Sequence, residues 1–124
     1  MFTKPCFIKG NSQTIINNLI DIGYNKVFED QYYNNCQYIG ANNGEIIPIN
    51  DGYIENLILE NGFIDCYSNR VLFYALASLD NDSVDNQWFI GPGNEWSKSK
   101  NTSDYLLEYG HKASVREIIE HFSK

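Results

Sequence analysis

Long apolar runs are missing from this sequence of 124 residues. No stretch approaches the roughly 18 apolar residues that a membrane-spanning helix requires. The first residues, Met-Phe-Thr-Lys-Pro-Cys, also lack the apolar segment of a signal peptide. These two absences predict a cytoplasmic protein that makes no contact with a membrane.

Cysteine is sparse, and the three residues present do not form a known pattern. Cys6, Cys36 and Cys66 include no Cys-x-x-Cys pair, and no histidines lie at the spacing of a zinc site. The acidic stretch at residues 80–85 differs from a calcium-binding loop, because Asp85 stands where that loop needs glycine. We therefore expect no metal and reduced thiols, with Cys6 and Cys66 buried as small hydrophobic side chains.

The motifs of common catalytic and cofactor sites are also missing. There is no Gly-x-Ser-x-Gly or Gly-x-Gly-x-x-Gly, and Gly91-Pro92-Gly93 lacks the lysine and the following helix of a Walker loop. His111 and His121 are interpreted as structural, and His121 lies four residues past Glu117, where the two side chains would pair. The sequence therefore predicts a protein without enzymatic activity or cofactor.

The charge of the chain is negative, with 16 Asp and Glu against 9 Lys and Arg, a formal net charge of -7. This charge opposes contact with phosphates and predicts no general nucleic acid binding. Aromatic residues make up 15% of the chain, and because each ring buries roughly 150–250 Å² they supply a substantial core. At this length we expect residues 1–124 to form a single domain.

The first half of the chain is expected to contain one helix and several strands. A strand is predicted at residues 4–8, and Asn11 or Ser12 then caps a helix that ends at Gly23. Its apolar face is predicted to hold Ile15, Ile16, Leu19 and Ile20. Asn43-Gly44 and Asp51-Gly52 are typical of tight turns, so an antiparallel meander is predicted with strands at residues 26–28, 37–39, 46–49 and 53–59.

The second half is expected to contain two more helices and a hairpin. A strand at residues 63–66 leads to a helix that Ser68 or Asn69 caps, with Val71, Leu72, Ala75, Leu76 and Leu79 on its buried face. A strand at residues 87–90 ends at Gly91-Pro92-Gly93, and Trp96 starts its partner. Ser114 and Glu117 form a capping box for the last helix, whose inward residues are Val115, Ile118, Ile119 and Phe122. This order indicates an α+β fold with about three helices on a mostly antiparallel sheet.

Aromatic and cationic side chains gather in the last third of the sequence. Aromatic faces stack on nucleobases and Arg or Lys donates to phosphate, so this composition suits a nucleotide-like ligand. The alternative is that the rings are core residues, and alternation along a strand sends Trp88 and Phe89 to opposite faces. The candidate ligand-binding residues are Trp88, Phe89, Trp96, Tyr105, His111, Lys112 and Arg116.

Several short motifs of the second half form a pattern: Asn69 with Leu72-Phe73, Gln87-Trp88-Phe89, His111-Lys112-Ala113, and Glu117-Ile118-Ile119 with His121-Phe122. This pattern resembles small proteins carried by bacteriophages and prophages of anaerobic bacteria. With Phe89 and Arg116 it is also similar to the Thoeris anti-defence proteins, which are α+β oligomers that sequester a cyclic ADP-ribose signal without cleaving it. Arg70 and Val71 depart from the pattern, in which acidic residues follow the position of Asn69. The resemblance implies a phage accessory protein and transfers no catalytic residues.

Two functions are predicted as alternatives. The first is a phage-encoded, non-enzymatic counter-defence protein that sequesters a small cyclic nucleotide in the host cytoplasm. The second is a protein-interaction or virion component, in which the acidic surface and Tyr32, Tyr33, Tyr38 and Tyr53 contact a host or phage protein. A homo-oligomer would suit either function, because a site shared between subunits encloses a ligand more completely.

Overall fold

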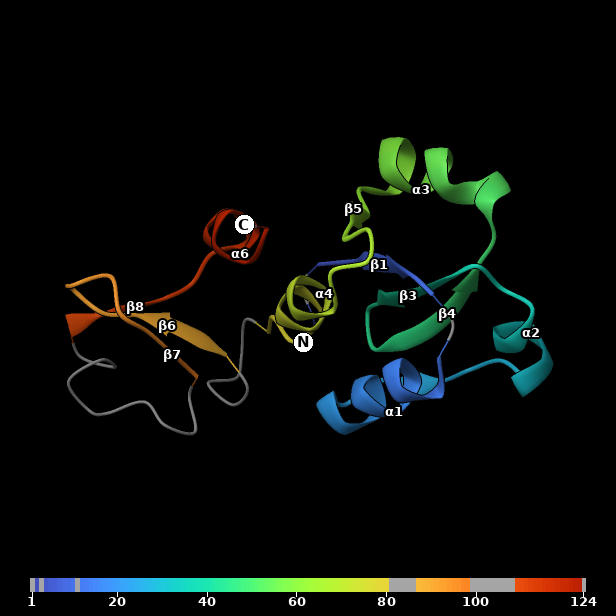
Figure 1. The fold of residues 1–124 in the computed structure, drawn as a ribbon, viewed down its shortest axis with the longest axis horizontal. Coiled ribbons are helices and arrows are strands. Elements are labelled where there is room, and N and C mark those ends of the chain that lie inside the picture. Colours follow the sequence, from blue (N-terminus) through green and yellow to red (C-terminus); the bar gives the residue numbers. More distant parts are fainter. Residues whose placement is uncertain (1, 3, 11, 81–86, 99–108, 124) are drawn as a thin grey trace.

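Two β-sheets and five α-helices make up the part of the chain that the computed structural model describes, residues 2, 4–10, 12–80, 87–98 and 109–123. The protein is therefore α+β, as predicted, but it has more helices than the three expected and two sheets in place of one. Figure 1 shows the larger sheet with α1, α2 and α3 in one half, the smaller sheet with α6 in the other, and α4 between them.

The larger sheet has five strands in the order β2-β4-β3-β1-β5. Their bounds are β1 (Cys6–Lys9), β2 (Asn25–Lys26), β3 (Tyr38–Asn42), β4 (Glu45–Ile49) and β5 (Ile64–Asp65). The central pairs β1/β3 and β3/β4 are antiparallel, whereas the edge strands β2 and β5 run parallel to their neighbours. The sheet is therefore mixed, and the expected antiparallel meander is correct only for its centre.

The hairpin between β3 and β4 turns at Asn43-Gly44, as predicted. Asn43 has φ 50° and Gly44 has φ 84°. Two positive φ angles in a two-residue loop are characteristic of the type I′ turn, which asparagine and glycine adopt at low cost. The second predicted turn, Asp51-Gly52, instead forms the 3₁₀ helix η1 (Asp51–Tyr53).

The first helix, α1 (Gln13–Ile22), has the predicted caps. The Ser12 hydroxyl accepts a hydrogen bond from the Ile15 amide, and Gly23, at φ 126°, donates to the last carbonyls of the helix. Such caps satisfy backbone groups that have no partner within the helix. Ile15, Ile16 and Leu19 are buried as expected, but Ile20 is exposed.

The predicted strand at residues 53–59 is wrong, since α3 (Ile54–Asn61) occupies this place. Ile54 and Leu57, three residues apart, lie on one side of a helix and pack on a small cluster of Phe7, Ile49 and Phe63. A helix brings both side chains to the sheet, whereas strand alternation would not. The five-residue helix α2 (Asp30–Asn34) was also not predicted. It carries Tyr33, which is only 1% exposed, so the prediction that this tyrosine contacts a partner protein is wrong.

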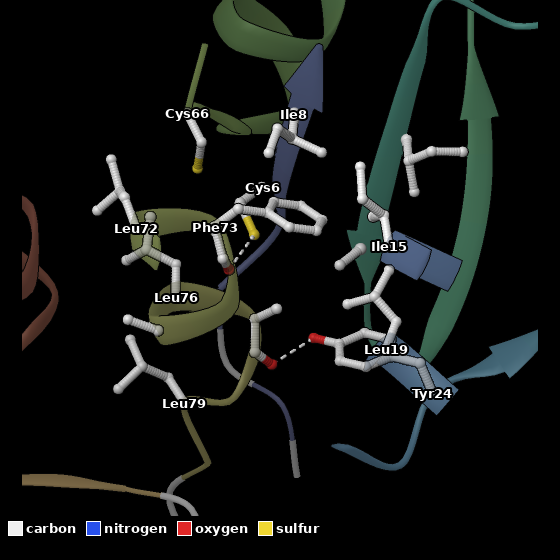
Figure 2. Packing of buried hydrophobic residues seen from close by; sticks show 14 of the residues in the cluster. Cys6, Ile8, Ile15, Leu19, Tyr24, Cys66, Leu72, Phe73, Leu76 and Leu79 are labelled. Carbon is white, nitrogen blue, oxygen red and sulfur yellow. Dashed lines mark hydrogen bonds between the residues drawn. The ribbon is translucent and has the colours of Figure 1, made fainter. Parts of the chain in front are cut away.

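The helix α4 (Arg70–Ala77) lies in the centre of the main core (Figures 1 and 2). Asn69 caps it by accepting from the Leu72 amide at 3.0 Å. The exposed Val71, at 58%, corrects the prediction that placed it inward. The buried residues of α4 face α1 and β1 on one side and α6 on the other. They are Leu72, Phe73, Ala75, Leu76 and Ala77.

The smaller sheet is antiparallel and has the order β7-β6-β8, with β6 (Trp88–Ile90), β7 (Trp96–Lys98) and β8 (His111–Lys112). The predicted hairpin is therefore confirmed. Next to the hairpin, the buried side chain of Gln87 makes two hydrogen bonds. Its Nε2 donates to the Ser78 carbonyl, and its Oε1 accepts from the backbone amide of Asp80. These bonds connect the start of β6 to the end of α4.

The last helix, α6 (Val115–Phe122), begins with the predicted capping box. Ser114 accepts from the Glu117 amide at 3.2 Å, and the Glu117 carboxylate accepts from the Ser114 amide at 3.0 Å. Ile118 is completely buried, and Val115, Ile119 and Phe122 are partly buried against the same core. Among the described residues, no helix has the length and apolar character needed to cross a membrane.

Replacing Tyr24 by Phe is expected to lower the free energy of unfolding by about 1 kcal/mol, because a buried hydrogen bond is lost. The Tyr24 hydroxyl donates to the carbonyl of Ala77, at the end of α4, over 2.7 Å (Figure 2). Urea denaturation measures the change. Tyr32→Phe, which alters an exposed ring of α2, serves as the control and is expected to leave the midpoint unchanged. Equal effects in both variants would contradict the role given to this bond.

The three thiols are expected to resist labelling by a disulfide reagent in the native protein at mildly alkaline pH. All three cysteine side chains are buried, as predicted for Cys6 and Cys66. Burial raises the pKa of Cys6, and the neighbouring Cys66 raises it further; burial also raises the pKa of Cys36. Because the thiolate is the reacting form, labelling should require unfolding and should follow the urea transition. Fast labelling of a native thiol would disprove this protection.

Candidate functional site

Aromatic rings from the β6–β7 hairpin and from α6 meet in one cluster. Trp88 and Ile90 lie on the same face of β6, and Trp96 pairs with Ile90 across the hairpin. The Phe122 ring lies 5.3 Å from the Trp88 ring and 5.7 Å from the Trp96 ring, measured between centroids. These partly buried rings pack on the main core and hold α6 against the sheet.

His121 extends the cluster toward solvent. Its ring stacks on Trp96 with a centroid distance of 4.0 Å and an interplanar angle of 14°. Beside this stack is a hollow of about 210 Å³, lined by Ile90, Asn94, Trp96, Glu117, Glu120 and His121. We call it the aromatic–carboxylate hollow. Its volume is below the roughly 300–1,000 Å³ of complete small-molecule sites, so it has room for one ring system of a ligand and not for a whole ligand.

The charge inside the hollow is negative. Its wall contains Glu117 and Glu120, and the side chains of His111 and Arg116 contact their carboxylates. His111 Nε2 lies 2.9 Å from Glu117 Oε2, and Arg116 Nε donates to Glu120 over 3.2 Å. The backbone amide of Ser114, and after it His111, lower the pKa of Glu117. The Glu117 carboxylate is therefore ionised near neutral pH and ready to accept hydrogen bonds.

Four of the predicted ligand-binding residues lie in or beside this hollow. Trp96 lines the hollow, and the Trp88 ring packs against the Trp96 ring. The Lys98 ammonium lies 5.8 Å from the Trp88 ring centroid. His111 contacts Glu117 and Arg116 contacts Glu120, and these two glutamates line the hollow. The side chain of Arg116 is 88% exposed, so its guanidinium reaches solvent beyond the carboxylate.

The structure places Phe89 and Lys112 away from the hollow. Phe89 is only 6% exposed and lies on the opposite face of β6 from Trp88. The Lys112 ammonium donates to the backbone carbonyl of Asp80. Tyr105 lies outside the described residues. Strand alternation places Trp88 and Phe89 on opposite faces of β6, and Trp88 is on the face that carries the hollow.

His121 and the carboxylates of the hollow were not predicted as site residues. The spacing of four residues predicted a pair of His121 with Glu117, but Glu117 instead contacts His111, and His121 stacks on Trp96. Glu120 and His121 follow Glu117 by three and four residues, which puts all three on one side of α6. This spacing was the feature of the sequence that could have indicated them as site residues. Only the packing of α6 on the hairpin shows that this side faces Trp96.

Two further hollows occur in the described part of the chain. One, of about 590 Å³, lies between β5, the start of α4 and α6, where Asn69 Nδ2 donates to the Phe122 carbonyl at 2.6 Å. The other, of about 480 Å³, runs along η1 and α3. Within residues 4–80, 87–98 and 109–123, no three His, Cys, Asp or Glu side chains are arranged to hold a metal ion.

No protein-family model, curated protein or solved structure matches this chain. We therefore infer the function from the chemistry of the hollow and its surroundings.

Replacing Glu117 by Gln is expected to lower stability at neutral pH and to have progressively less effect as the pH falls. Glutamine keeps the capping geometry but removes the charge. Because the folded pKa of Glu117 is lowered, its charge stabilises the fold above the unfolded pKa of about 4.3 and this contribution is lost as the pH falls through the folded value.

Urea denaturation of both proteins over a series of acidic pH values measures this difference. Glu45→Gln, on the exposed start of β4, is the control and should show no such trend. A difference that stays constant across the series would show that the charge of Glu117 does not contribute.

Proposed function

We propose that this protein is a non-enzymatic binding protein that sequesters a small nucleotide, with the nucleobase at the aromatic–carboxylate hollow. One observation carries the proposal: the Trp96–His121 stack and two carboxylates line the same hollow, which has room for one ring system. Sequestration requires affinity and no bond cleavage, so it needs no catalytic residues. This fits a chain in which no catalytic motif is found.

A nucleobase satisfies both features of the hollow. Its π-face stacks on aromatic side chains, an interaction of about 1–3 kcal/mol per base. Its amino and ring N–H groups donate to carboxylates, as cytosine N4 does to Glu or Asp. Glu117 and Glu120 are the acceptors for these donors, and His121 is the exposed ring on which the base stacks.

The phosphate of the ligand must lie outside the hollow, because two carboxylates repel it. Arg116 is suited to this contact, since its guanidinium has several donors and its Nε bond to Glu120 is solvent-exposed. Exposed ion pairs are weak, typically about 0–1 kcal/mol, so a phosphate competes with Glu120 at small cost. The resemblance to phage proteins makes a cyclic ADP-ribose derivative the first ligand to test.

Thermal-shift measurements with linear nucleotides, cyclic dinucleotides and cyclic ADP-ribose isomers test the proposal. A ligand at a hundredfold excess over its Kd adds about 2.7 kcal/mol to the free energy of unfolding, which raises the melting temperature. The ligand recovered after heat denaturation should be chemically intact. No shift with any nucleotide, or a cleaved product, would refute sequestration.

Glu120→Gln is expected to weaken binding of the identified nucleotide about tenfold, because one charged acceptor of the base is lost. Glu120 is exposed, so the fold should be unaffected. Titration calorimetry measures the affinity, and Glu45→Gln is the matched control outside the hollow. If Glu120→Gln and Glu45→Gln bind the nucleotide with equal affinity, the base does not bind at the aromatic–carboxylate hollow.

A further inference from the structure

The net charge of the protein lies entirely in residues 27–69. This segment contains seven carboxylates and no lysine, arginine or histidine, whereas the rest of the chain contains nine Asp and Glu and nine Lys and Arg. The segment spans α2, β3, β4, η1, α3 and β5. One part of the fold is therefore acidic and the remainder is neutral.

Within this acidic part, η1 and α3 expose apolar side chains. Tyr53 is 65% exposed and Leu59 is 74% exposed, and none of the eight residues of α3 is buried. Figure 1 shows α3 on the side of the larger sheet away from α1. Ile54 and Leu57 attach the helix to the sheet, and Ile54 also lines a hollow along the side that stays open.

The exposed side of α3 combines apolar groups with carboxylates. The hollow of about 480 Å³ along it is lined by Asp51, Ile54, Glu55, Ile58 and Leu59. Ile54 and Ile58 are four residues apart, as are Glu55 and Leu59, so they form two neighbouring rows on the helix surface. An apolar side chain that enters this hollow has carboxylates beside it.

The charge decides what kind of partner fits. Nucleic acids and anionic membranes are repelled by a surface that has only negative charge. A second copy docked symmetrically through the same face would bring like charges together, because a two-fold interface places the same patch on both sides. A partner that combines positive charge with apolar side chains is attracted by the carboxylates and also covers Leu59 and Ile58.

We propose that η1 and α3 form a docking surface for a basic amphipathic helix of another protein. Apolar side chains of the partner, spaced one helical turn apart, fill the hollow beside Ile54, Ile58 and Leu59, and its Lys or Arg side chains pair with Asp51 and Glu55. This surface uses different elements from the aromatic–carboxylate hollow, so the inference stands independently of the nucleotide proposal. It gives the protein-interaction hypothesis a specific surface.

Fluorescence anisotropy with two labelled helical peptides tests the inference on the full chain. One peptide has a row of leucines and otherwise lysines, and in the other every lysine is replaced by glutamate. The lysine peptide should bind, with an affinity that falls as salt is added, and the glutamate peptide should not. Absence of binding by the lysine peptide would overturn the proposal.

Matched variants separate a specific surface from general charge attraction. Leu59→Ser and Glu55→Lys should each weaken binding about tenfold, a typical effect for a central interface residue. Ile20→Ser and Asp21→Lys make the same kinds of change on the exposed side of α1 and should alter binding less than twofold. Equal losses in Glu55→Lys and Asp21→Lys, with no loss in either serine variant, would show attraction by net charge alone and would overturn the proposal.

Sedimentation velocity of the protein without peptide identifies the competing occupant. Self-association that Leu59→Ser abolishes would assign the surface to a second copy and overturn the proposal. A wild-type chain that stays monomeric at the concentrations of the anisotropy assay supports a separate partner. Thermal melts of all four variants confirm that they are folded, which is expected because each changed side chain is exposed.

Discussion

The fold depends on the burial of α4 between two sheets. Its inner side chains, Phe73 among them, pack on β1 and α1, while Leu72 and its neighbours meet α6. The helix is therefore apolar around most of its circumference, as expected for an element inside a core. Tyr24 and Gln87 satisfy carbonyls at its end, so the polar backbone groups there remain bonded despite burial. Without α4, the two sheets would have no shared hydrophobic core.

The aromatic–carboxylate hollow is a consequence of how α6 is held. Glu117 caps the helix and also lines the hollow, and Phe122 packs on both indoles while its neighbour His121 faces outward. Side chains that stabilise α6 therefore also position the candidate site. For the proposed nucleotide, side chains already held by the packing of α6 would reduce the ordering cost of binding. In the proposed complex the same carboxylates would accept from the donors of the base, and the phosphate would lie at the rim.

Charge divides the protein into two surfaces with different chemistry. The neutral part contains the hollow and both histidines, and the acidic part contains the open side of α3. A small ligand at α6 and a basic protein partner at α3 would contact different elements. The chain therefore has room for both a ligand and a partner, although it is short.

The sequence by itself determined the features that local hydrogen bonding controls. Gly23, Asn43-Gly44 and the Ser114–Glu117 box were predicted correctly, and Ser12 was one of two predicted caps, because each acts on backbone groups within a few residues. Only the tertiary structure decided that residues 53–59 form a helix, that β2 and β5 run parallel to their neighbours, and that Val71 faces solvent. At the site, the hairpin spacing placed Trp88 and Trp96 together, whereas the contact of His121 with Trp96 depends on the docking of α6. These features result from packing between distant segments, and short apolar runs such as residues 53–59 suit a helix or a strand equally well.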